Sequence, residues 1–395
     1  MKFGMKGSYT ADIAVFGGGM AGISAALAAA RMGRDVILVE KQCWLGGLAT
    51  QGLITIFLPL CDGEGHQVTY GIAEELLKLS MLHGWEDRYP SAWLSEDHIE
   101  QRKKQRYEVQ YNPHLFALEA EKLLLKNGVR IFYDTQLISL KAEEDRIVDS
   151  CILRKDGFFH LKVQQYIDTT GDLVAAQTLP LACESYDQNM PAAWYYSHSE
   201  KDGLKLRMLG VLETSNPNEK TEKISEDLFS GLYGDENDQI FYLSHGKMLE
   251  HFLQKKQSQS DYVPVNTPTV MQIRMSRRLA GRDILKEEDS FKRFEDSIGV
   301  IGNWKKHGPV YEVPYRCLYA EEFANLLTAG RSINVTGTMW DITRVIPGCC
   351  ITGQAAGEAA ALAMDGDARK LEISLLQASM REHGVRVHIN EIDMD

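Results

Sequence analysis

The sequence of 395 residues lacks the usual marks of an extracellular or membrane-spanning protein. Its seven cysteines are odd in number and scattered, and no CxxC pair occurs, which favours free thiols in a reducing compartment. It contains no run of about 18 apolar residues, and its N-terminus lacks the apolar core of a secretory signal. We therefore expect a cytoplasmic protein without a membrane partner.

Basic charge is also scarce. The chain has 43 Lys and Arg against 55 Asp and Glu, which gives a formal net charge of -12. Because binding to nucleic acid requires cations that neutralise phosphates, we expect no nucleic-acid partner. The 44% hydrophobic and 25% charged residues are typical of a globular protein, and the length allows two or three domains. We predict no metal site.

The richest motif lies near the N-terminus, where Gly17, Gly19 and Gly22 form a GxGxxG after an apolar strand at 13–16 and before an alanine-rich helix at 20–32. Glycine at these positions permits a tight turn, close approach of a pyrophosphate, and close packing of helix on strand. The helix start, including Met20 and Ala21, would offer N–H groups and partial positive charge to the phosphates.

A second apolar strand at 36–39 ends in Glu40, 18 residues after Gly22, and Lys41 follows. A carboxylate there can accept hydrogen bonds from both ribose hydroxyls of an adenosine, and it disfavours the 2′-phosphate of NADP. The two strands, the helix and the acid together predict a dinucleotide site.

The next residues favour FAD over NAD. The stretch KQCWLGGLATQG brings a second glycine turn directly after the acid. The elongated flavin dinucleotide needs backbone that lies flat against its ribityl chain and ring. The predicted contacts in this turn are Gly46, Gly47, Leu48, Ala49 and Thr50.

With three later blocks, the chain resembles the FAD-dependent oxidoreductases of the glutathione-reductase-like superfamily, in the branch close to fumarate reductase and aspartate oxidase flavoproteins. The later blocks are YNPHLFALEAEKLLLKNGVRIFYDT, YIDTTGDLVAA and LLTAGRSINVTGTMWDITRVIPGCCITGQAAGEAAALA. The resemblance covers most of the chain. Because LATQG contains no histidine, it implies non-covalent FAD. The further FAD contacts that it implies are Leu137, Thr170, Gly171, Asp172, Gly330, Arg331, Gly348, Ile351, Thr352, Gly353 and Gln354.

The expected fold class is α/β, with a Rossmann-like FAD-binding domain made of a parallel sheet and a β-meander. We predict that this domain is discontinuous, formed by residues 1–185 and 325–395, with an α+β substrate domain inserted at 186–324. Two helices are predicted from apolar and charge patterns. One spans 113–127, with Leu115, Leu118, Ala120, Leu123 and Leu124 on one side, and the other spans 270–285, with Arg274, Arg278 and Arg282 on one side.

The substrate would meet the flavin between the two domains. Arg344 lies four residues before Gly348, and the resemblance implies that an arginine here borders the active site, where it could bind a carboxylate. Other candidate catalytic residues are Tyr315, Arg316 and His307. Cys349 and Cys350 precede a predicted helix start at 352, which would lower a thiol pKa.

We expect hydride transfer between flavin N5 and a small polar substrate, possibly a carboxylate, with an electron donor or acceptor that the sequence does not identify. Two alternatives stay open, a flavin monooxygenase or halogenase and a non-catalytic FAD-binding protein. A homo-oligomer is also left open.

Overall fold

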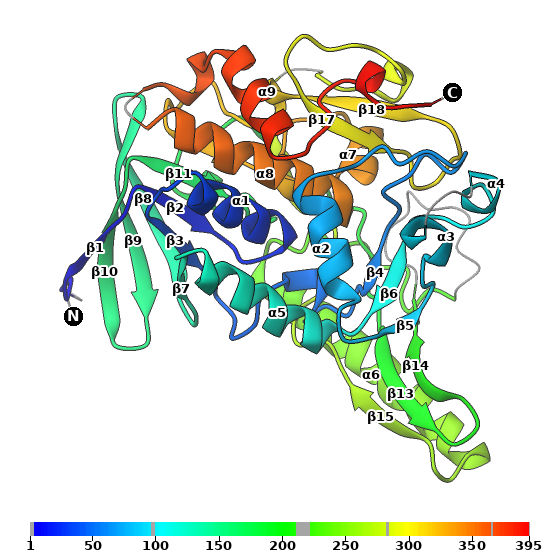
Figure 1. The fold of residues 1–395 in the computed structure, drawn as a ribbon. Coiled ribbons are helices and arrows are strands. Elements are labelled where there is room, and N and C mark those ends of the chain that lie inside the picture. The colour runs from blue at the N-terminus through cyan, green and yellow to red at the C-terminus, as the bar shows by residue number, and fades with distance from the viewer. Residues whose placement is uncertain (1–3, 96–98, 211–221, 282–283, 365, 395) are drawn as a thin grey trace.

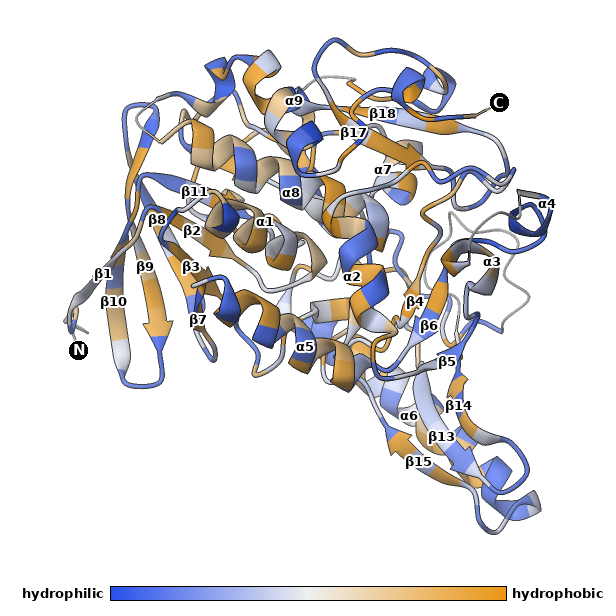
Figure 2. Cartoon of the chain, in the orientation of Figure 1, coloured by the Kyte–Doolittle hydropathy of each residue, from blue (hydrophilic) through white to orange (hydrophobic). Residues whose placement is uncertain are grey.

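The computed structural model describes residues 4–95, 99–210, 222–281, 284–364 and 366–394. At its centre lies a five-stranded parallel sheet (Figure 1). Its strands are short, and all of their residues are buried except Arg130 and Ile131 of one edge strand, which are partly exposed. Figure 2 shows the apolar character of the strands that it labels. In sheet order they are β19 (Leu326–Thr328), β11 (Gln165–Asp168), β2 (Ile13–Phe16), β3 (Val36–Val39) and β7 (Arg130–Phe132).

The sheet joins distant parts of the chain, because β19 pairs in parallel with β11. Beside it lies the predicted meander of β8 (Gln136–Glu143), β9 (Arg146–Arg154) and β10 (Gly157–Lys162), to which β1 (Ser8–Thr10) adds in parallel. The predicted α/β fold class with a parallel sheet and a meander is confirmed.

Two small-residue helices, α1 (Met20–Arg31) and α8 (Ile346–Leu362), pack closely on one another. A Cβ on Gly353 would lie 2.2 Å from the Ala21 carbonyl oxygen, and a Cβ on Gly357 would lie 2.2 Å from that of Ala25. The glycines therefore let the two backbones touch. Among the described helices, none is both long and apolar enough to cross a membrane.

The other body helices include α2 (Ile72–Ser80), α7 (Gly337–Thr343) and α5 (Pro113–Lys126). The predicted apolar side of α5 is confirmed for Ala120 and Leu124, which are buried, and is wrong for Leu115 and Leu118, which are 37% and 50% exposed. The helix also buries Pro113, Phe116 and Ala117, because this side faces α1 and α2.

An arm projects from the body (Figure 1). It consists of an antiparallel sheet, in the order β14 (Gly203–Arg207), β13 (Tyr195–Ser199) and β15 (Val263–Asn266), together with the long helix α6 (Gly234–Ser258). Two strands lead between arm and body, β12 (Cys183–Ser185) and β16 (Arg277–Leu279), which pair with each other.

The helix predicted over 270–285 is wrong. Residues 270–276 are irregular and 277–279 form β16, while Arg282 lies outside the described residues. Apart from Val270, Met271 and Arg277, residues 270–279 are buried. A helix would have exposed one face, whereas this extended segment is enclosed on both sides.

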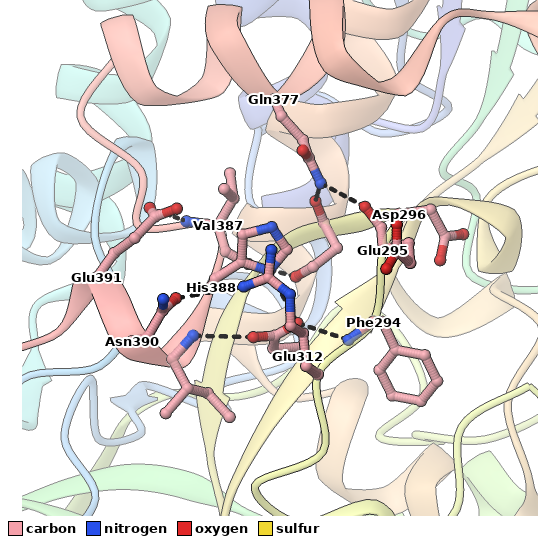
Figure 3. Close-up of polar contacts among 12 residues, drawn as sticks. Phe294, Glu295, Asp296, Glu312, Gln377, Val387, His388, Asn390 and Glu391 are labelled. Carbon is pink, nitrogen blue, oxygen red and sulfur yellow. Dashed lines mark hydrogen bonds and ion pairs between the residues drawn. The ribbon is translucent and has the colours of Figure 1, made fainter.

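The C-terminal part packs back on the body. The hairpin of β17 (Ser297–Gly302) and β18 (Val310–Pro314) shares its hydrophobic core with α1 and α8, beside α9 (Ile373–Glu382). Buried Glu312 accepts hydrogen bonds from the Phe294 and Ile389 N–H groups and contacts His388 Nδ1 at 3.0 Å (Figure 3). This network fixes the last residues to the hairpin. The domain boundaries at 185/186 and 324/325 stay predictions.

The structure also has a small antiparallel sheet, in the order β4 (Ile56–Phe57), β6 (Val109–Tyr111) and β5 (Trp85–Asp87), and two short helices, α3 (Ser91–Leu94) and α4 (Ile99–Arg102).

Candidate functional site

The first glycine turn forms an open backbone cradle at the start of α1. Gly17 has φ +100°, and a Cβ on it would lie 2.7 Å from the Thr169 carbonyl oxygen. A Cβ on Gly22 would lie 1.8 Å from the Gly17 carbonyl oxygen. By contrast, apart from Gly19 itself and its two neighbours in the chain, no atom of the described residues lies within 4 Å of the Cβ position at Gly19. The turn therefore has no room for side chains where it faces the sheet, at Gly17 and Gly22. It has open space at Gly19, directly before Met20, the first residue of α1.

Glu40 ties this turn to the next one. Its carboxylate accepts hydrogen bonds from the N–H groups of Gly18, at 2.6 Å, and Gln42, at 2.8 Å. The side chain is buried, and this burial raises the pKa of the Glu40 carboxyl, although the two N–H groups act in the opposite direction. Lys41 is exposed beside it.

The second glycine turn lies against the first. The Gly46 N–H donates to the Gly18 carbonyl at 2.7 Å, and Gly46 has φ +99°. A Cβ on Gly47 would lie 3.5 Å from Gly19 Cα. After the half-buried Leu48, Ala49 accepts a hydrogen bond from the Tyr111 hydroxyl at 2.8 Å, and Thr50 donates to the Leu45 carbonyl at 2.5 Å. The predicted residues of both turns thus form one surface.

The turn after β11 is organised by Asp168, a residue that the sequence did not single out. Asp168 is fully buried and accepts hydrogen bonds from the Thr170 N–H and hydroxyl, at 2.9 and 2.6 Å. Its burial raises the pKa of its carboxyl. At Gly171, which has φ +81°, a Cβ would lie 2.0 Å from Arg331 Nη2, and Asp172 lies 3.8 Å from the same guanidinium.

α8 begins six residues earlier than the predicted start at 352. The N–H groups from Ile351 to Gln354 are therefore used inside the helix, and only its first turn, which includes Gly348, has N–H groups free of helical bonds. Thr352 contributes a side chain instead, since its hydroxyl accepts a hydrogen bond from the Gly330 N–H at 3.0 Å.

Several predicted contacts serve packing. Gly353 faces Ala21 of α1, and Gly299 of β17 packs on Ile351. The Gln354 side chain accepts a hydrogen bond from the Ile72 N–H at 2.9 Å, so it faces α2. Leu137 of β8 is half-buried in the core beside the meander.

Arg344 lies between α7 and α8 in a buried ion cluster. Its guanidinium pairs with Asp341, which also pairs with the Lys305 ammonium. Arg344 and Asp341 are 8% and 4% exposed. Burial raises the pKa of the Asp341 carboxyl, but Arg344 and Lys305 outweigh it, and the pKa lies below its usual value. Asp341 is a second residue that the sequence did not indicate.

The other predicted catalytic side chains have contacts elsewhere. The buried Tyr315 hydroxyl donates to the Ala368 carbonyl at 2.8 Å, and Arg316 pairs with Asp296. The half-exposed His307 ring lies 3.9 Å from Glu64. The structure therefore does not gather the four predicted catalytic residues into one cluster.

The buried segment before β16 lies against the Gly171 turn. The Ser276 hydroxyl donates to Asp172 at 2.7 Å, and Arg331 donates to the Arg274 carbonyl at 3.1 Å. The Arg274 guanidinium lies 4.8 Å from the Trp194 ring centroid, and that of Arg278 lies 5.3 Å from the ring of Trp340. The Arg274 backbone and the Ser276 side chain thus border the predicted cofactor residues, in an irregular segment and not on a helix. The Arg278 guanidinium pairs with Glu184.

The residues present fit FAD. The open backbone at Gly19, the buried acid at Glu40 and the contact between α1 and α8 supply what a long dinucleotide needs at its phosphates, its adenosine ribose and its far end. Among the described residues, no group of three His, Cys, Asp or Glu side chains could hold a metal ion.

Solved structures similar to this chain include three proteins with at most 13% sequence identity to it. A geranylgeranyl bacteriochlorophyll reductase-like protein from Thermoplasma acidophilum has 13% identity over 95% of this chain and 82% of that chain, with a TM-score of 0.45. The p-nitrophenol 4-monooxygenase PnpA from Pseudomonas putida DLL-E4 has 11% identity over 94% of this chain and 84% of that chain, with a TM-score of 0.48. L-proline dehydrogenase from P. horikoshii has 10% identity over 96% of this chain and 100% of that chain, with a TM-score of 0.45.

No curated protein matches the chain significantly. The model of a family described as FAD dependent oxidoreductase, however, matches residues 12–193 and 184–380, which together make up most of the chain. The protein therefore belongs to the FAD-dependent oxidoreductase family, and its cofactor is FAD.

Proposed function

We propose that the protein catalyses hydride transfer between N5 of non-covalently bound FAD and a small polar substrate that carries a carboxylate. When bound, FAD supplies the group that accepts or gives the hydride. The observation that carries the proposal is the buried cationic cluster around Arg344, directly ahead of α8. A buried guanidinium can bind a carboxylate through two parallel hydrogen bonds.

The predicted FAD contacts are part of this proposal. Gly19 and Met20 would meet the pyrophosphate, Glu40 the adenosine ribose, and Gly46 to Thr50 the ring. The open cradle at Gly19 and the direct contact between the two glycine turns support this path. The Gly348 N–H, in the first turn of α8, would stabilise negative charge at the pyrimidine edge of the flavin.

The roles in substrate binding follow from the contacts. Arg344 would bind the substrate carboxylate, and Asp341 would hold the guanidinium in place. Arg274, whose guanidinium lies over the Trp194 ring, would keep the surroundings cationic. The charge of Arg278 is offset by its ion pair with Glu184. The arm, within the predicted substrate domain 186–324, would cover the ring and select the substrate.

Anaerobic titration of the purified flavoprotein with a panel of small carboxylic acids and their methyl esters tests the proposal. We expect an acid to bleach the flavin absorbance and its ester to fail. Arg344→Gln should retain FAD but reduce the bleaching rate by about 10- to 100-fold, because hydrogen bonds to charged groups contribute about 1.5–3 kcal/mol.

Arg344→Lys is the matched control, since it keeps the charge and loses the two-pronged geometry. Its rate should lie between those of the wild type and Arg344→Gln. Equal bleaching by acid and ester would contradict the carboxylate assignment. Oxygen consumption coupled to substrate hydroxylation, without anaerobic bleaching, would favour a monooxygenase.

A further inference from the structure

Helix α6 has an apolar stripe on its outer face. Its inner face buries Ile240, Ser244 and Met248, which are spaced four residues apart. On the opposite face, Tyr242, Leu249 and Leu253 are 72%, 58% and 51% exposed. Their spacing of seven and four residues places them in one line along the helix. A single exposed leucine needs no explanation, but an aligned set on an otherwise polar helix does.

Charged residues extend the stripe with opposite signs at its two ends. Asp235 and Asp238 lie in the first turns of α6, on the same outer line, and Lys256 lies in its last turn. In the isolated chain the Lys256 ammonium donates to the Tyr262 carbonyl at 3.3 Å. The midpoint of the stripe lies between His245 and Gly246. At Gly246 no atom of the described residues comes within 4 Å of a Cβ position.

This pattern is complementary to itself when reversed. If a second α6 lies antiparallel about that midpoint, Asp235 faces Lys256 of the second copy and Tyr242 faces Leu249 of the second copy. Asp238 and Leu253 would also lie opposite each other, and this contact between a carboxylate and an apolar side chain does not add to the complementarity. Gly246 lies beside the axis, where the lack of a side chain allows the helices to approach closely. A parallel arrangement would instead set Asp235 against its own copy, which is repulsive.

We propose that the outer face of α6 forms a homodimer contact, with α6 of one copy packed antiparallel against α6 of the other around a two-fold axis. Such a contact is isologous, as in most homodimers. The helix is about 37 Å long at a rise of about 1.5 Å per residue, which gives a long seam. α6 belongs to the arm that projects from the body (Figure 1).

Light scattering coupled to size-exclusion chromatography of the full-length, FAD-loaded protein tests the proposal. We expect a dimer for the wild type and a monomer for Leu249→Asp/Leu253→Asp. Leu204→Asp is the matched control, because Leu204 is 48% exposed on β14 of the same arm. It pairs with exposed His198, on the face of the sheet opposite the Tyr195–His251 contact with α6. Circular dichroism and flavin content check that each variant folds.

A charge exchange tests the antiparallel direction. Asp235→Lys alone and Lys256→Asp alone should each raise the dimer dissociation constant by about 3- to 10-fold, since each breaks two exposed ion pairs. The double variant should return close to the wild type, because both pairs are restored with their signs reversed. A monomeric wild type, a dimer that survives Leu249→Asp/Leu253→Asp, or no recovery in the double variant would overturn the proposal.

Discussion

At the scale of single residues, a small polar cluster joins the arm to the body. Glu86 of β5 contacts the hydroxyl of Tyr196 on β13, and the same hydroxyl lies 2.6 Å from the Thr55 hydroxyl. Gln110 donates to Glu86 at 3.4 Å. Burial raises the pKa of Glu86 to about 7, although the hydrogen bonds from Tyr196 and Gln110 lower it. Its carboxyl thus titrates near neutral pH.

This titration gives a pH-dependent stability. Because the pKa of Glu86 in the folded protein exceeds its ordinary value of 4.5, the stabilisation is fully present below that value and is lost as pH rises through about 7. Relative to Glu86→Gln, the wild type should lose about 1–2 kcal/mol of unfolding free energy over this range, after a discount for partial exposure. Urea unfolding of both proteins from pH 5 to pH 8 measures it. A constant difference between them would contradict the assignment to Glu86.

Residues with local roles could be predicted from the sequence, whereas residues with distant partners could not. The Gly17–Gly22 motif and Glu40 act within one strand-turn-helix-strand unit, so their spacing identifies them. Asp341 acquires its role from Lys305, which lies 36 positions away and reaches it only in the fold. The expected lowering of the Cys349 thiol pKa is wrong, since complete burial raises it to about 11.

At the scale of elements, the contact between α1 and α8 decides whether the two predicted ends of the FAD site meet. Gly357→Ala places a Cβ 2.2 Å from the Ala25 carbonyl oxygen, a backbone atom that moves only with α1. Overpacking of this kind costs about 1–3 kcal/mol. We expect a matching loss of unfolding free energy together with weaker FAD binding, although Gly357 lies about three turns inside α8.

Gly337→Ala is the control. Gly337 begins α7, and no atom of the described residues lies within 4 Å of its Cβ position. Its substitution should change the unfolding free energy by under about 1 kcal/mol. Denaturant unfolding and fluorescence titration with FAD compare both variants. Unchanged FAD affinity in Gly357→Ala would show that the spacing of the two helices does not shape the site.

Errors in the predicted elements arose from contacts with neighbouring elements more than from local sequence propensity. The charge spacing of Arg274 and Arg278 fits a helix, yet the segment is extended, because body and arm enclose it and β12 pairs with its end. On α5, Leu115 and Leu118 were expected on the buried side, but Phe116 and Ala117 are buried there instead, beside α1 and α2. In both cases the neighbouring elements determine the conformation or the buried side, and the local sequence does not identify those neighbours.

At the scale of the whole molecule, the parallel sheet joins segments from distant parts of the chain that share a sequence pattern. β19 follows a long intervening segment, yet it extends the sheet beside β11 with an apolar strand that ends in a glycine turn, as β2 does. Repetition of this strand-and-glycine pattern near both ends predicted the arrangement. The inner boundaries of the middle part lack such a pattern, and β17 and β18 share a core with α8.

If the start of α1 and the start of α8 both bind one FAD molecule, FAD binding must slow amide hydrogen exchange in both segments. Hydrogen exchange of the apoprotein, with and without added FAD, should show slower exchange at residues 17–31 and at 346–354. The arm strands β13 to β15 should change little, since they lie outside the predicted FAD contacts. Amides at the start of α8 would gain protection because the ligand stabilises every segment that must open to release it. Protection of residues 17–31 alone would mean that α8 supports the sheet without holding the cofactor.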